Sequence, residues 1–220
     1  MTTIFSSVPY FSELNPDDLL AVEQSAIRRT FQPEEFVLME GDPVGGLYVV
    51  ESGWLKVVKL STGGREQVLN FLGAGDVFNG VAVFTESVNQ ASVIALEKAV
   101  VWWISADTMQ NLLDTHPKLA RYVIRDLAGR LQHLVGLVED LSLRSVESRL
   151  ARTLLEGTID ASVPRQKWAT QTEMASRLGT VPDVLNRALR KLVEEGLIAV
   201  TRHQIRIIDP EGLKRKIGPV

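Results

Sequence analysis

Residues 170–196 read TQTEMASRLGTVPDVLNRALRKLVEEG, and this stretch carries the signals of two short consecutive helices. Thr170 and Glu173 form a T-x-x-E capping box, in which the threonine side chain accepts a hydrogen bond from a backbone amide at the start of a helix. Gly179 is the residue type expected just beyond a helix C-terminus, and Pro182 suits the first turn of the next helix. Two short helices joined by a turn that contains glycine are typical of a helix-turn-helix.

The second of these helices is predicted to have an apolar face and a polar face. The apolar side chains at helical spacing are Leu185, Ala188, Leu189, Leu192 and Val193. Recognition helices meet DNA bases near their N-termini, so we expect base contacts from Asp183, Asn186 and Arg187. Contacts with DNA phosphates are expected from Thr170, Thr172, Arg190, Lys191, Arg202 and His203. The alternative is a plain helical hairpin whose charged face is only solvated.

The flanking residues extend the motif in both directions. Gly196 ends the second helix, and the runs Leu197–Val200 and Gln204–Ile208 are predicted to pair as a β-hairpin wing. On the other side, a helix is predicted to begin at Ser145 and to end at Gly157. We therefore expect residues 145–220 to form a winged helix-turn-helix domain.

The distribution of charge supports this assignment. The chain has 220 residues and a formal net charge of −3. Residues 1–144 carry 11 basic and 18 acidic side chains, whereas residues 145–220 carry 13 basic and 9 acidic ones. A basic module joined to an acidic one indicates that only the C-terminal part meets a polyanion such as double-stranded DNA.

The N-terminal half has the pattern of a β-structure. Asn15 and Pro16 open a helix that is predicted to run to about Ile27. Short β-rich runs separated by glycine-containing turns follow: Phe36–Met39, Leu47–Val50, Trp54–Leu60, Gln67–Phe71, Ser92–Leu96 and Val100–Ile104. Many short strands with turn signals between them favour a sandwich or roll over a parallel α/β sheet.

A long helix is predicted after Pro117. Its apolar residues alternate at intervals of four and three: Ala120, Ile124, Leu127, Leu131, Leu134, Val138 and Leu141. Such a heptad seam, with β-branched residues at one position and leucine at the other, favours a parallel two-stranded coiled coil. Val123, Val135 and Leu137 form a second stripe that is predicted to pack on the roll. The alternative is a helix that only covers its own core.

These segments predict an α+β chain with three parts: a sensor β-roll with an N-terminal helix in residues 1–116, a dimerisation helix and hinge in residues 117–144, and the DNA-binding domain in residues 145–220. The hinge is expected at Leu141–Ser145. The chain would act as a homodimer.

Composition excludes several other classes of protein. The absence of cysteine excludes disulfides, thiolate zinc sites and cysteine-ligated iron–sulfur clusters. There is no apolar run of membrane-spanning length and no secretory signal at the N-terminus, so we expect a cytoplasmic protein with no membrane partner. No metal-ligand spacing, phosphate-binding glycine loop followed by lysine, or nucleophile elbow is present. We therefore do not expect an enzyme.

With these motifs in place, the chain resembles the Crp/Fnr family of bacterial transcription regulators over nearly its whole length. The resemblance rests on Gly41-Asp42, Leu47-Tyr48-Val49, Ser52-Gly53, the run 72–78 (LGAGDVF) and His116-Pro117, followed by the long helix and the winged helix. It implies a double-stranded β-helix (the cyclic-nucleotide-binding type of roll), a dimer on a two-fold operator, allosteric control by an effector in the roll, and contact with RNA polymerase.

The resemblance also bears on the effector. In cyclic-AMP-binding members an acidic residue holds the ribose, and an arginine followed by serine holds the phosphate. These positions fall here on Val81, Asn89 and Gln90. Polar contacts to adenine fall on Leu134 and Val135. A phosphate buried without a cation is costly, so we do not expect cyclic AMP.

The effector itself is not identified by the sequence. A neutral, largely apolar pocket is predicted from Phe78, Asn79, Gly80, Val81, Asn89, Gln90, Leu127, Leu131, Leu134 and Val135. The three histidines, His116, His133 and His203, are interpreted as surface residues, so haem is not expected. The four tryptophans, Trp54, Trp102, Trp103 and Trp168, are interpreted as packing residues. An empty, constitutively active pocket remains open, as does a cyclic-nucleotide-binding-like regulatory protein without DNA binding.

Overall fold

The computed structural model describes residues 4–12, 14–43, 45–157, 162–164, 170–201 and 204–218, with the backbone alone for 162–164. Two compact units are present: residues 1–63 with 69–133, and residues 64–68 with 134–220. Arg202, His203 and Trp168, which the sequence analysis singled out, lie outside the described residues.

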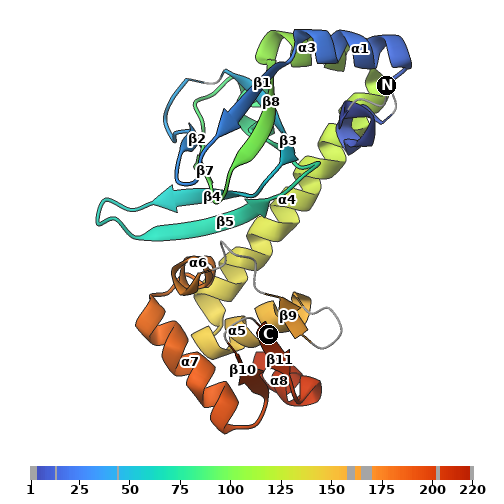
Figure 1. Ribbon diagram of the computed structural model, residues 1–220. Helices are drawn as coiled ribbons and strands as arrows, with labels where there is room; N and C mark the ends of the chain where they lie inside the picture. Colours follow the sequence, from blue (N-terminus) through green and yellow to red (C-terminus); the bar gives the residue numbers. More distant parts are fainter. Residues whose placement is uncertain are drawn as a thin grey trace. The chain divides into compact units, whose positions relative to one another are not determined.

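The first unit is built on two four-stranded sheets, ordered β1-β8-β3-β6 and β2-β7-β4-β5 (Figure 1). The strands are β1 (Ile27–Phe31), β2 (Phe36–Leu38), β3 (Gly46–Ser52), β4 (Leu55–Leu60), β5 (Glu66–Leu72), β6 (Val77–Phe78), β7 (Ser92–Ala95) and β8 (Ala99–Ser105). All six predicted strands are confirmed, and the central pairs β3–β8 and β4–β7 are antiparallel. The roll is the predicted one, with β1 and β6 added to it.

Strand β3 shows how the sequence alternation divides the unit into layers. Tyr48 and Val50 point between the two sheets, into a core shared with Leu55 and Phe78. The alternate residues Leu47 and Val49 belong to a second core, which lies under the helices. Because successive side chains of a strand point to opposite faces, one central strand serves both cores.

The helical elements of the first unit are η1 (Ile4–Ser7), η2 (Pro9–Phe11), α1 (Pro16–Ser25), α2 (Gly80–Thr85) and α3 (Ala106–Thr115). The long α4 (Pro117–Leu143) belongs to the first unit up to residue 133 and to the second unit from residue 134. Asn15 caps α1 as predicted, since its side chain accepts a hydrogen bond from the amide of Asp18 at 2.9 Å. The predicted end of α1 at Ile27 is wrong: Ile27 already pairs with Trp103 in the sheet. The sequence analysis did not predict α2 and α3.

The long helix α4 confirms the prediction of a helix after Pro117. Leu119 and Val123 are buried against the second core, and Leu127 packs on it in part. Val123 therefore faces the roll as predicted, whereas Val135 of the same predicted stripe is exposed. None of the described helices is long and apolar enough to cross a lipid bilayer.

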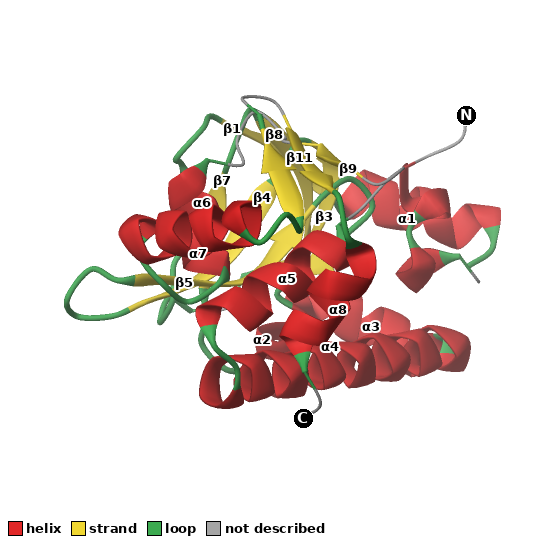
Figure 2. Ribbon diagram, turned by 90° about the horizontal axis from the view of Figure 1, so that it is seen from below, coloured by secondary structure: helices red, strands yellow, loops and turns green. Residues whose placement is uncertain are grey.

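The second unit contains α5 (Val146–Glu156), β9 (Ser162–Pro164), α6 (Gln171–Arg177), α7 (Pro182–Glu194), β10 (Ile198–Val200), β11 (Gln204–Ile207) and α8 (Pro210–Ile217). The predicted helix-turn-helix and wing are present, and β9 adds a third strand beside β11. Figure 2 shows α6 beside α7, and the two helices are in contact.

The core of the second unit is formed by one stripe from each helix. On α7 it takes Leu185, Ala188, Leu189 and Leu192. The inclusion of Val193 in this face was wrong, because its side chain is exposed. At about 100° per residue, Val193 lies about 40° around the helix beyond Leu189, the outermost member of the buried stripe on that side, and so falls outside it.

Candidate DNA-binding and effector sites

The turn between α6 and α7 is held by backbone and capping bonds. The side-chain oxygen of Thr170 accepts a hydrogen bond from the amide of Glu173 at 3.2 Å, so the first half of the predicted capping box is formed. Gly179 has a φ of 62°, in the left-handed region that favours glycine. Pro182 then occupies the first position of α7. These local signals set the angle at which α7 leaves the turn.

The N-terminal half of α7 presents unpaired polar groups to solvent. Asp183 and Arg187 are exposed and lie one turn apart. Within the described part of the chain, neither side chain has a hydrogen-bond or ion-pair partner. Asn186 is half-buried, and its amide nitrogen donates to Gln171 Oε1 of α6 at 3.3 Å. Two of the three predicted base-reading side chains are thus free, and the third is held by the preceding helix.

The cations in the C-terminal half of α7 are arranged differently. Lys191 Nζ donates to Glu147 Oε1 on α5 at 2.8 Å, and this bond raises the pKa of Lys191. Arg190 is exposed and donates only a long bond, 3.4 Å, to the carbonyl oxygen of Asn186. Thr170 and Thr172 are exposed at the start of α6. Arg190 is therefore the freer of the two cations predicted to meet phosphates on α7.

One face of α4 is exposed and has no partner among the residues that the structure describes. The exposed fractions of Ile124, Leu131 and Val138 are 67%, 64% and 64%, and that of Val135 is 60%. Leu134 and Leu141 are also exposed, and Ala120 is half-buried. Leu127, in contrast, packs in part on the core of the first unit. The exposed apolar stripe is therefore centred on Ile124, Leu131, Val135 and Val138.

Helix α4 ends at Leu143, inside the predicted hinge Leu141–Ser145, so only Arg144 and Ser145 separate it from α5. Ser145 caps α5 by accepting a hydrogen bond from the amide of Ser148 at 3.2 Å. Arg149 reaches back from α5, and its Nη1 donates to the carbonyl oxygens of Asp140, Leu141 and Arg144 at 3.2–3.4 Å. A guanidinium at the C-terminal end of a helix stabilises its unpaired carbonyls. The connection between the helices is thus tied by one buried side chain.

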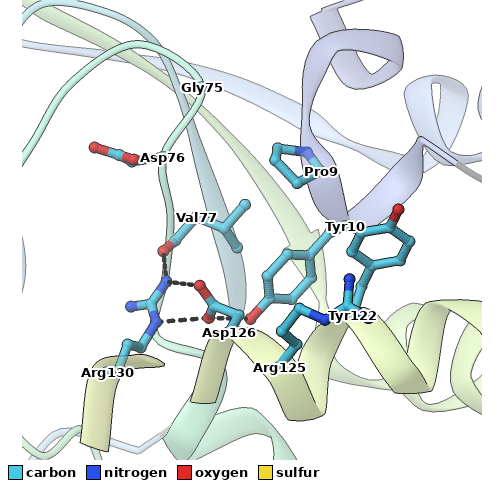
Figure 3. Close-up of a pocket in the computed structure, with 9 residues that line it drawn as sticks. All are labelled: Pro9, Tyr10, Gly75, Asp76, Val77, Tyr122, Arg125, Asp126 and Arg130. Atoms are coloured by element: carbon cyan, nitrogen blue, oxygen red, sulfur yellow. Dashed lines mark hydrogen bonds and ion pairs between the residues drawn. The ribbon is translucent and has the colours of Figure 1, made fainter. Parts of the chain in front are cut away.

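The predicted effector residues lie in several environments. Phe78 is buried and stacks on Tyr48, with ring centroids 4.9 Å apart. Gly80 and Asn89 are buried, whereas Val81, Gln90, Leu131, Leu134 and Val135 are exposed. Asn79 and Leu127 are intermediate, and the amide nitrogen of Asn79 donates to the carbonyl oxygen of Gly46 at 3.0 Å. None of these ten residues lines the cavity shown in Figure 3.

That cavity, of about 280 Å³, was not predicted from the sequence. It lies between η2, the turn before β6, and α4, and its lining residues are Pro9, Tyr10, Gly75, Asp76, Val77, Tyr122, Arg125, Asp126 and Arg130 (Figure 3). The i,i+4 spacing of Asp126 and Arg130 was readable in the sequence. Nothing in the sequence joins them to Tyr10, which lies 116 residues away along the chain.

The chain was compared with known proteins. Residues 28–116 match the family model "Cyclic nucleotide-binding domain", and residues 148–216 match "Crp-like helix-turn-helix domain". Over 212 residues the chain is 31% identical to the "Probable transcriptional regulator flp" of Lacticaseibacillus casei, covering 94% of each protein. The chain belongs to the Crp/Fnr family.

Other similarities agree with this membership. The "CRP-like cAMP-activated global transcriptional regulator" of Mycobacterium tuberculosis is 27% identical over 203 residues, covering 87% of this chain and 91% of that protein. The fold is also that of FixK2 from Bradyrhizobium japonicum, with a TM-score of 0.76 at 21% identity over 89% of this chain and 98% of that chain. The protein is a DNA-binding transcriptional regulator of the Crp/Fnr family with a cyclic-nucleotide-binding-type sensory domain.

Two of the histidines of this Crp/Fnr regulator lie in the described part and are hydrogen-bonded. His116 Nε2 lies 2.8 Å from Asp18 Oδ2, and His133 Nε2 lies 3.0 Å from the carbonyl oxygen of Leu69. Crp/Fnr regulators bind DNA as dimers and commonly contact RNA polymerase, and some members bind cyclic nucleotides.

Proposed function

We propose that this Crp/Fnr regulator binds a two-fold DNA operator as a homodimer and reads bases with Asp183, Asn186 and Arg187. The single observation that carries the proposal is the pair of unpaired, exposed side chains, Asp183 and Arg187, on the N-terminal half of α7. An arginine donates two hydrogen bonds to guanine O6 and N7, and an aspartate accepts one from the cytosine amine. Asn186 and the exposed Arg190 would complete the contact.

The dimer is proposed to form through the exposed stripe of α4. Ile124, Leu131, Val135 and Val138 are spaced by seven, four and three residues, so they stay on one side of a helix. Contiguous apolar side chains this exposed are typical of a protein interface. Two parallel copies of α4 related by a two-fold axis would present two copies of α7, and the matching operator is an inverted repeat.

Each part of the chain is proposed to have its own role. We propose a sensor roll in residues 1–116, a dimer helix and hinge in residues 117–144 and a DNA-binding domain in residues 145–220. The matched family models, residues 28–116 and 148–216, lie inside the first and last of these. We further propose that the protein acts in the cytoplasm, without catalytic activity, and contacts RNA polymerase as Crp/Fnr regulators commonly do.

Selection from random-sequence DNA tests the proposed function. The full-length protein is expected to enrich an inverted repeat whose half-sites lie about one helical turn apart, because the recognition helices of a two-fold dimer enter successive major grooves. The enriched repeat should be lost with Arg187→Ala and kept with Glu211→Gln, an exposed residue on α8. Recovery of no common sequence by the wild-type protein would favour a regulatory protein that does not bind DNA.

The effector of the roll is proposed to be something other than a cyclic nucleotide. At the position of the family's phosphate-binding arginine, the buried Asn89 donates its amide nitrogen to the carbonyl oxygen of Met39 at 3.1 Å. Within the described part of the chain, its side-chain oxygen is buried with no hydrogen-bond partner. Gln90 turns its amide nitrogen to the carbonyl oxygen of Val88 at 2.9 Å. A phosphate there would meet a carbonyl oxygen instead of a guanidinium, which is unfavourable.

Thermal unfolding in the presence of cyclic AMP tests the proposal that the effector is not a cyclic nucleotide. A ligand present at about 100 times its dissociation constant stabilises the folded state by roughly 2.7 kcal/mol, which gives a clear rise in Tm. We expect no rise with millimolar cyclic AMP, and no change in operator affinity. The reciprocal variant Asn89→Arg supplies the missing cation. A rise in Tm with the wild-type protein that disappears in Asn89→Ala would show that the amide replaces the arginine and that the charge argument is wrong.

A further inference from the structure

The cavity between η2, the turn before β6, and α4 has an inner wall on which Tyr10, Asp126 and Arg130 bond to one another. Tyr10 Oη donates to Asp126 Oδ2 at 2.7 Å, and Arg130 Nε donates to the same carboxylate oxygen at 2.6 Å. Arg130 Nη2 also donates to the carbonyl oxygen of Val77 (Figure 3). Burial and the bond to Asp126 raise the pKa of Tyr10, so its hydroxyl keeps the proton that it donates. The carboxylate of Asp126 is thereby neutralised within the wall.

The remaining lining consists of aromatic and apolar groups, the carboxylate of Asp76 and one available cation, Arg125. The ring of Tyr10, Pro9 and the ring of Tyr122 face the cavity from two elements that are distant in sequence (Figure 3). Arg125 is exposed, and its guanidinium lies 5.6 Å from the centroid of the Tyr122 ring. Within the described residues, the guanidinium of Arg125 makes no hydrogen bond or ion pair. The guanidinium is thus held at the rim with its donors unused.

The charge around the rim is positive. A second hollow of about 290 Å³ adjoins the first, shares Tyr122 and Arg125 with it, and adds Lys118 and Arg121 to its lining. The acids lining the two hollows are Asp126, already neutralised, and Asp76, whose Oδ2 accepts a hydrogen bond from the amide of Gly73 at 2.8 Å. In a chain with a net charge of −3, this local excess of cations favours an anion.

The cavity stays open if α4 dimerises as proposed. Tyr122 and Asp126 each lie two residues from Ile124, the first residue of the exposed apolar stripe. At 3.6 residues per turn, this spacing places them on the opposite side of the helix. The cavity is also separate from the effector position at Asn89 and Val81, since neither residue lines it. A dimer partner on the stripe would therefore leave the cavity accessible to a small molecule.

We propose that this cavity binds a small carboxylic acid with an aromatic body, as a second ligand site of the regulator. The aromatic body would lie against Tyr10, Tyr122 and Pro9, because flat rings pack well on such walls. The carboxylate would take the two parallel donors of Arg125, the geometry in which a guanidinium binds carboxylates most strongly. One free guanidinium in a cavity that Asp76 also lines matches a single negative charge better than a phosphate dianion. The cavity volume, at the low end for ligand pockets, limits the ligand to a small molecule.

Calorimetric titration of the full-length protein, without DNA, tests this. The probes are benzoate, phenylacetate and indole-3-acetate, each paired with its neutral amide. At least one acid is expected to bind, with its amide at least about tenfold weaker, since a charge-assisted hydrogen-bond pair is at stake. Arg125→Gln should weaken the acid by at least about tenfold and leave the amide unchanged. The matched control is Arg29→Gln, because Arg29 also lies over a ring, 5.4 Å from the centroid of Trp103, but on β1.

Two results would overturn the proposal. One is the absence of binding by all three acids up to about 10 mM, a concentration at which even millimolar affinity is visible. The other is equal binding of the acid by the wild-type protein and by Arg125→Gln, which would place the acid elsewhere. Both measurements are made without DNA, so their failure leaves the proposed operator recognition unaffected. Failure of operator selection would equally leave this ligand site standing.

Discussion

Leu131→Glu is expected to convert the dimer into a monomer and to abolish operator binding. Leu131 lies in the middle of the exposed stripe of α4, so in the proposed parallel dimer its two copies would face each other. Two carboxylates would then be desolvated side by side in an apolar interface. Either the carboxylates become protonated or the dimer dissociates. We expect a loss of at least about 3 kcal/mol in dimer stability, more than a hundredfold in its dissociation constant.

Sedimentation velocity measures this directly, with operator binding followed in parallel. Val138→Glu should behave in the same way, since Val138 lies one heptad further along. Leu20→Glu is the matched control, because Leu20 is an exposed leucine on a helix of the roll, away from the stripe. Leu127→Glu is a poorer test, because Leu127 also packs on the core of its own unit. Unaltered dimers of both Leu131→Glu and Val138→Glu would refute this interface.

Arg187→Ala is expected to cost about 1–3 kcal/mol of binding free energy on the selected operator and much less on random DNA. The reason is that a bidentate bond to guanine is made only at the correct base pair. Arg190→Ala, three residues further along α7, should weaken binding to both DNAs to a similar degree. It should also reduce the dependence of affinity on salt, because a phosphate contact releases counterions regardless of sequence.

Fluorescence anisotropy on the two DNAs at several salt concentrations separates these effects. Arg187→Lys is a useful third variant, since lysine keeps the charge but loses the paired donors. It should retain binding to random DNA and lose preference for the operator. If Arg187→Ala weakened the operator and random DNA equally, Arg187 would be only a phosphate contact. Asp183 and Asn186 would then have to carry the base preference.

Most of the secondary structure could be predicted from local patterns. The six strands, the long α4, the helix-turn-helix and both wing strands each have a periodic pattern or a cap that acts within a few residues. The cap of Thr170 on Glu173, the left-handed Gly179 and Pro182 at the start of α7 are local in this sense. Strand β6 and helix α2 are too short for periodicity to detect. The end of α1 was mispredicted because Ile27 pairs with Trp103 of β8, 76 residues away in the sequence. A pairing over that distance leaves no local sequence pattern.

The candidate sites, like the secondary structure, could be predicted from the sequence only where they depend on local spacing. Spacing along α4 and α7 was sufficient to propose the apolar stripe and the base-reading residues, because both belong to single helices whose faces are set by 3.6 residues per turn. Which of the predicted residues are free was decided by packing: Leu127 of the seam turns toward its own core, whereas Val135, predicted to pack on the roll, stays exposed. Spacing alone treats all seven predicted seam residues alike.

Composition, caps and periodicity thus sufficed for the kind of protein, a roll followed by a long helix and a winged helix, because these signals act over a few residues or sum over the chain. Only the tertiary structure decided which side chains have hydrogen-bond or ion-pair partners among the described residues and which do not. It ties Lys191 to Glu147 and leaves Arg187 free, and it closes Asp126 between Tyr10 and Arg130 while Arg125 stays available. The physical reason is that hydrogen bonds and burial are made between residues brought together by folding, and their partners are not neighbours in the sequence.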